Sequence, residues 1–65
     1  MIFIGTKIRA TKNLFMNMGG QWAKEGKIYD IVYVDEDLFE IIDDRGDLHI
    51  LSDVHINENF DILKH

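Results

Sequence analysis

Two histidines and an aspartate are the side chains in this sequence best suited to metal binding. His49, Asp53 and His55 lie close together, but their spacing matches no compact zinc motif, and the chain has no cysteine to complete a closed site. Two solvent-facing histidines beside a turn explain the pattern more simply. The sequence therefore predicts no metal site here.

A cluster of carboxylates surrounds a glycine just before these histidines in the sequence. Asp43, Asp44 and Asp47 flank Gly46 as in part of a calcium loop, but the twelve-residue ligand pattern and its closing glutamate are missing. The same residues are typical of a type I turn that closes a hairpin. Carboxylates act as general acid and base only in a cleft that shifts their pKa values, which a domain of this size rarely encloses. With no nucleophile motif and no glycine-rich phosphate loop, we predict that the protein is not an enzyme and binds no cofactor.

The length and composition predict one small folded domain over residues 1–65. The chain has 46% apolar side chains and no proline or cysteine. Its longest uninterrupted apolar run, residues 1–4, is far shorter than a membrane span or the apolar part of a signal peptide. We therefore expect a soluble cytoplasmic protein without a membrane partner.

The charge is divided along the chain. Residues 1–29 carry five basic side chains against one acidic one, whereas residues 30–61 carry eleven acidic side chains against Arg45 alone. The formal net charge of −5 repels a phosphate backbone at long range, so generic nucleic-acid affinity is disfavoured. The acidic side chains either keep a sheet protein soluble or form a face that docks a basic partner.

The hydrophobic pattern from Ile28 onward predicts strands. Residues 28–34 are rich in β-branched and aromatic side chains, and residues 38–42 resume that character after an acidic interruption at residues 35–37. Residues 47–51 form the returning strand of a second hairpin, and residues 2–11 and 60–63 add two flanking strands. No segment shows a sustained helical period, so the chain is predicted to be all-β.

A three-residue loop at 35–37 and a four-residue loop at 43–46 fix a register for this meander. Tyr33 then faces Phe39, Ile31 faces Ile41, and Phe39 and Ile41 face Ile50 and Leu48, all on one apolar side. In the first strand, the same alternation places Ile2, Ile4, Ile8 and Ala10 inward, and Phe60 and Ile62 close the structure from the last strand. The best fit is a small five-stranded SH3-like barrel with a long first loop.

Three segments carry a resemblance to a known group of proteins. Residues 7–13, residues 26–31 and residues 39–46 resemble the small SH3-like proteins encoded by phages and prophages of low-GC Gram-positive bacteria, mostly of unknown function. The resemblance implies the fold, a host-cell cytoplasm, and a host- or phage-directed binding task without catalytic residues. This chain departs from the pattern because residues 52–55 stand where a proline is expected and because residues 1–4 form an apolar extension.

The stretch from Lys12 to Glu25 is the least barrel-like part of the sequence. It holds several large apolar side chains around Gly19 and Gly20, enough to cap a core. Phe15 and Trp22 are expected to plug the open end of the barrel. The alternative is that some of these side chains stay exposed, because methionine and tryptophan are well suited to partner surfaces.

The sequence thus favours a non-catalytic module that binds a protein. The predicted contact is an acidic face or the apolar loop, with the candidate residues Asp35, Glu36, Asp37, Asp43, Asp44, Asp47, Phe15, Met18 and Trp22. The alternative is a single-stranded nucleic-acid-binding module that uses a basic set with one aromatic, namely Lys7, Arg9, Lys12, Lys24 and Trp22. Cross-strand pairing of Lys7 and Arg9 with acidic neighbours such as Glu40 is the structural explanation for that set. The protein is expected to be a monomer or a weak homodimer that pairs through residues 1–4.

Overall fold

The computed structural model of the protein describes residues 1–63, which form eight strands and one short helix. In chain order these are β1 (Lys7–Ala10), β2 (Leu14–Phe15), β3 (Gln21–Ala23), β4 (Ile28–Asp30), β5 (Tyr33–Asp35), β6 (Leu38–Ile42), β7 (Leu48–Ser52), α1 (Asp53–Asn59) and β8 (Phe60–Ile62). The expectation of a fold built from strands is confirmed, but the strands number eight instead of the five expected for the barrel, and one helix is present.

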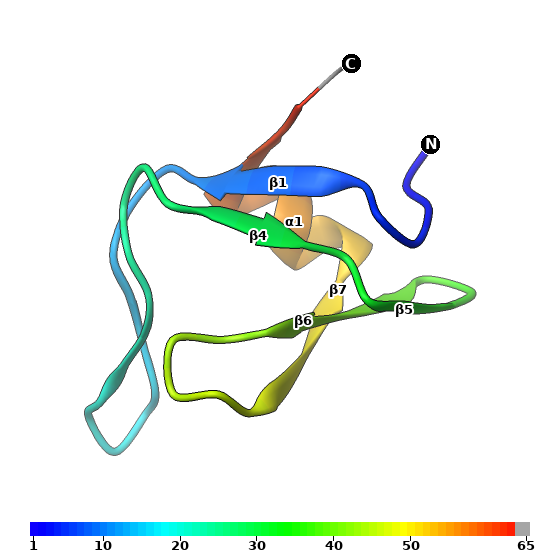
Figure 1. Cartoon of the computed structure of the whole chain (residues 1–65). Coiled ribbons are helices and arrows are strands. Elements are labelled where there is room, and N and C mark those ends of the chain that lie inside the picture. The colour runs from blue at the N-terminus through cyan, green and yellow to red at the C-terminus, as the bar shows by residue number, and fades with distance from the viewer. Residues whose placement is uncertain (64–65) are drawn as a thin grey trace.

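The strands form three antiparallel sheets, and none of them closes on itself within residues 1–63. One sheet has the order β4-β1-β8, a second consists of β2 and β3, and a third has the order β5-β6-β7. Figure 1 shows β1 and β4 above the meander of β5, β6 and β7, with α1 behind the space between them. The chain passes from the first of these sheets to the third through residues 31–32, between β4 and β5.

The core is built from inward side chains of the two three-stranded sheets, of β3, of the connection between β4 and β5, and of α1. In β1, Ile8 and Ala10 are buried while Lys7 and Arg9 are exposed, as the alternation predicts. The buried apolar set is Ile8, Ala10, Trp22, Ala23, Tyr29, Ile31, Phe39, Ile41, Leu51, Ile56 and Phe60. Ile4, which was predicted to point inward, is exposed because the strand begins only at Lys7, after a turn.

The predicted register of the meander is wrong by one residue in both hairpins. Tyr33 pairs with Glu40 and Phe39 pairs with Leu51, so Tyr33 and Ile50 lie on the outside of the sheet. The first turn is shorter than expected, because Glu36 adopts a φ of 54° and the chain reverses over two residues. In the second turn the Asp43 N–H bonds the Asp47 carbonyl at 2.9 Å, so residues 44–46 reverse the chain where four residues were expected, and Ile42 pairs with Leu48.

The prediction of an all-β chain is wrong at residues 53–59, which form α1. This helix has seven residues, fewer than the two full turns over which a hydrophobic period can be recognised. Its start is fixed by Ser52, whose Oγ accepts a hydrogen bond of 3.1 Å from the His55 N–H, and by Asp53 in the first turn. The helix buries Ile56 against the core and leads directly into β8.

Removing the cap of α1 is expected to lower the stability of the whole domain. Ser52→Ala leaves an amide of the first turn without its partner, so the free energy of unfolding should fall by about 1 kcal/mol. Ser52→Asp keeps an acceptor at the same position and should stay within about 0.5 kcal/mol of the parent. Urea unfolding followed by circular dichroism measures both variants. An equal loss in the two would show that the hydroxyl is not a cap.

The long stretch after β1 is a hairpin rather than an open loop. β2 and β3 pair, and in β3 both Trp22 and Ala23 are buried while Gln21 stays outside. Trp22 is therefore a plug, as expected, but Phe15 is 60% exposed and does not act as one. Met18 lies at the tip of the hairpin and is fully exposed.

Candidate functional site

The outward face of the β5-β6-β7 sheet carries several large apolar side chains that are exposed. We call it the sheet face and define it by outward side chains at paired positions of the three strands: Tyr33, Asp35, Leu38, Glu40, Ile42, Leu48 and Ile50. Five of these side chains are large and apolar, and they are between 47% and 62% exposed. Exposed apolar side chains gathered on one face, unlike scattered ones, are typical of an interaction surface.

Acidic side chains border the sheet face at the end where β5 turns into β6. Asp35, Glu36 and Asp37 are all exposed there, and Glu40 lies on the face between Tyr33 and Ile50. The ion pairs found among residues 1–63 involve other carboxylates, so these four charges remain uncompensated. Three of the predicted acidic residues thus lie together at exposed positions at this end.

The second acidic turn is mainly a structural unit. The Asp43 side chain is fully buried and accepts hydrogen bonds from the main-chain N–H groups of Arg45 and Asp47, at 2.9 and 3.2 Å. The Arg45 guanidinium and the His49 Nδ1 lie 3.1 and 3.2 Å from its other oxygen. Burial alone would raise the pKa of Asp43, but the bonds from Asp47, His49 and Arg45 outweigh it and lower that pKa. Asp43 holds the turn and cannot meet a partner.

Asp44 and Asp47 differ from Asp43 in exposure. Asp47 is exposed and lies 3.6 Å from the Arg45 guanidinium. One Asp44 oxygen accepts hydrogen bonds from the Lys27 ammonium at 2.5 Å and from the Tyr29 hydroxyl at 2.9 Å. The bond to Asp44 raises the pKa of Lys27, and burial raises the pKa of Tyr29. This network ties the second hairpin of the meander to β4.

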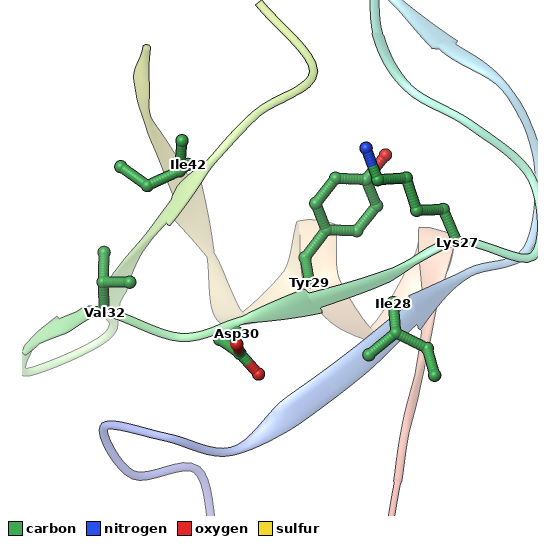
Figure 2. A pocket seen from close by; sticks show the side chains of 6 residues that line it. All are labelled: Lys27, Ile28, Tyr29, Asp30, Val32 and Ile42. Carbon is green, nitrogen blue, oxygen red and sulfur yellow. The ribbon is translucent and has the colours of Figure 1, made fainter. Parts of the chain in front are cut away.

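A hollow of about 230 Å³ lies beside that network, between β4 and the end of β6. It is lined by Lys27, Ile28, Tyr29, Asp30, Val32 and Ile42. Figure 2 shows Tyr29 and Lys27 on one side of the hollow and Val32 and Ile42 on the other, while Ile28 and Asp30 point to the opposite side of β4. Ile42 belongs to both the hollow and the sheet face, so the two surfaces are continuous.

The histidines are not the solvent-facing pair expected from the sequence. His49 stacks on the Trp22 ring with 3.8 Å between ring centroids, and His55 approaches the same ring edge-on at 5.7 Å. Both line a hollow of about 210 Å³ next to Phe15. Among residues 1–63, no group of three or more potential ligands is close enough to hold a metal ion.

The predicted basic set is divided by the fold. The Lys7 ammonium lies 2.7 Å from the Asp30 carboxylate, and Arg9 pairs across the sheet with Asp61, so both have acidic neighbours. Cross-strand pairing was the expected explanation, although the partners differ from Glu40. Lys12 and Lys24 are exposed near the hairpin. Trp22 is 3% exposed, so it offers no ring on which a base could stack.

Comparisons of the chain with family models, with curated proteins and with solved structures found no match. In the part of the chain that the structure describes, no helix is long and apolar enough to cross a membrane.

Sequence reasoning missed two features of these surfaces. The apolar sheet face was hidden by the one-residue error in register, because that error turned Tyr33, Leu48 and Ile50 inward. The buried contact of Asp43 with His49 joins residues on either side of the second turn. The position of Asp43 at the start of an Asp-rich turn could have indicated this contact. An aspartate there bonds main-chain groups of its own turn, and the turn brings residue 49 back beside residue 43.

Proposed function

We propose that this protein is a non-catalytic binding module that docks a basic protein partner through the sheet face. The main support for this proposal is the set of five exposed apolar side chains on one face of the β5-β6-β7 sheet, which acidic groups border. Apolar contacts of this kind supply affinity, and the surrounding charges select the partner and speed its approach.

Charge complementarity argues for a basic partner. Glu40 lies on the sheet face itself, and Asp35 lies beside it. A second copy docked face to face would bring these carboxylates together, and each copy has a net charge of −5. A surface that combines apolar side chains with lysine or arginine satisfies both the apolar and the acidic groups.

The fold is part of the same proposal. We take it to be an open variant of the SH3-like barrel, and from the resemblance to small phage and prophage proteins we propose that it works in the cytoplasm of a bacterial host. Three features support this arrangement: the first strand β1 lies next to the last strand β8, a long hairpin-bearing connection follows β1, and a short helix precedes β8. Fold alone assigns no function, so the sheet face carries the argument.

A pair of matched substitutions tests the sheet face. Ile50 and Ile4 are 61% and 66% exposed, but only Ile50 lies on the sheet face. We expect Ile50→Thr to reduce the capture of basic proteins from a lysate of a low-GC Gram-positive bacterium at least tenfold, which corresponds to about 1.4 kcal/mol. Ile4→Thr should leave capture unchanged. Quantitative mass spectrometry of tagged pull-downs at low and moderate salt measures the difference.

Two outcomes would contradict this function. Equal capture by the Ile50 and Ile4 variants would show that the sheet face is not the contact. Loss of the captured material after nuclease treatment would instead favour the basic residues of β1 and a nucleic-acid ligand. Thermal unfolding of both variants serves as the control, because an exposed isoleucine-to-threonine change in a strand should shift stability by only about 0.5 kcal/mol.

A further inference from the structure

We infer that the outer edge of β4 accepts an extended segment of the partner as an additional strand. This inference rests on the proposed function, because the segment is taken to belong to the protein that the sheet face holds. It adds a binding mode, which is main-chain pairing, and a sequence pattern for the bound segment.

The hydrogen bonds between β1 and β4 show which main-chain groups of β4 have no partner in the sheet. The Ala10 N–H bonds the Lys27 carbonyl at 3.0 Å, and the Ile31 N–H bonds the Thr6 carbonyl at 2.9 Å. In an antiparallel pair the residues alternate, so the main chain at residues 27, 29 and 31 faces β1 and the main chain at 28 and 30 faces away.

The groups that face away have no strand to pair with. β4 is the edge of its sheet, with β1 as its one neighbour. Within residues 1–63, no hydrogen bond engages the main-chain N–H or C=O of Ile28 or Asp30. The two residues are two positions apart, which is the spacing at which an added strand exchanges its hydrogen bonds. A row of unpaired groups of this kind is a template for strand addition.

The residues around the edge of β4 determine which side chains the added strand must have. On one side of β4 lies the 230 Å³ hollow, where Tyr29, Val32 and Ile42 present ring and aliphatic surface. On the other side lie Ile28 and the exposed carboxylate of Asp30, whose Oδ1 bonds the Lys7 ammonium at 2.7 Å, while its Oδ2 has no hydrogen-bond partner among residues 1–63. Side chains of an extended segment alternate between these two sides, so the matching segment alternates apolar and basic residues. Its basic residues also suit the net charge of −5.

A synthetic heptapeptide of alternating lysine and valine, blocked at both ends, is the probe. We expect it to bind the full chain, and we expect the same peptide with glutamate in place of lysine to bind at least tenfold more weakly. On binding, the Ile28 and Asp30 amides should exchange with solvent at least tenfold more slowly. The Tyr29 amide faces β1, so its exchange should change little. NMR detects both effects.

N-methylation of the peptide separates strand addition from side-chain attraction. Methyl groups on the valine nitrogens block one edge of the added strand, and methyl groups on the lysine nitrogens block the other. One of the two methylated peptides should lose at least tenfold in affinity and the other should not. In the protein, Ile28→Pro removes one of the unpaired N–H groups and should weaken binding, since an edge strand tolerates proline at a position that faces away from its neighbour.

The outcomes distinguish this inference from the proposed function. Equal effects of the two methylated peptides, unchanged Ile28 and Asp30 amides, or no binding at about 1 mM would each overturn strand addition. None of these results depends on Ile50. The capture experiment with the Ile50 and Ile4 variants therefore still tests the sheet face separately. If Ile28→Pro fails to fold, the methylated peptides and the amide exchange of the parent protein still decide the question.

Discussion

Replacing Trp22 with alanine is expected to unfold most of the protein at 25 °C. Trp22 is 3% exposed, and its ring lies against His49, His55 and Phe60. It therefore joins the β2-β3 hairpin to β7, α1 and β8 at one point. Truncating a buried aromatic side chain costs about 3–5 kcal/mol, whereas a domain of this length has about 3–10 kcal/mol in total. The loss is thus comparable to the whole stability.

Urea unfolding followed by far-ultraviolet circular dichroism measures this effect without relying on the tryptophan signal. Trp22→Phe keeps an aromatic ring in the same place and should retain a cooperative transition. Met18→Ala is the matched surface control, because Met18 is in the same hairpin but fully exposed, and its effect should stay within about 0.5 kcal/mol. A loss below about 1 kcal/mol in Trp22→Ala would show that the ring is not part of the core.

Replacing Asp43 is the second large effect that we expect. Its buried carboxylate accepts two main-chain and two side-chain hydrogen bonds, from Arg45, Asp47 and His49. Asp43→Ala leaves those donors without their acceptor at the turn between β6 and β7, so the free energy of unfolding should fall by about 2–3 kcal/mol. Asp47→Ala removes an exposed carboxylate from the same turn and should cost less than about 1 kcal/mol.

The pH dependence of stability reports on Asp43 independently. Its pKa is lowered in the folded protein, so it contributes stability above its unfolded pKa of about 4 and loses that contribution as the pH falls through the lower folded value. Urea unfolding between pH 3 and pH 7 should therefore show a drop on the acid side for the parent protein. Asp43→Asn should show a smaller drop, and an identical slope in both would contradict the assignment.

The sequence predicted the sheets of this protein better than their register. Alternation along β1 and β6 correctly placed Ile8, Ala10, Phe39 and Ile41 in the core. The register, however, depends on the length of two turns, and Glu36 adopts a positive φ although it is neither glycine nor asparagine. A one-residue change there reverses which residues face solvent, and this is why the sheet face could not be predicted.

The only part of the candidate site that the sequence could predict is its acidic border, because a run of charged residues can be recognised from composition alone. The acidic border at residues 35–37 was visible as a run of charge, and these residues are exposed in the fold. Asp43 has the same residue type as its neighbours but is buried, because the turn directs its carboxylate toward two amides and His49. A charge pattern gives the number of acidic groups in a segment. Which of those groups are exposed and which are bonded within the fold depends on contacts that the pattern does not show.

The pairing of β1 with β8 also determines when the protein can fold. Ile8 pairs with Ile62, so residues near opposite ends of the chain must meet before the β4-β1-β8 sheet is complete. Closing so long a loop carries an entropic cost before its contacts form, which slows folding relative to a helical domain of the same size. During synthesis, a ribosome that has released only β1 to β7 holds a chain whose first strand still lacks one of its two partners. The β4-β1-β8 sheet of this protein is therefore completed only after β8 has been translated, whereas the other strand pairings can form earlier.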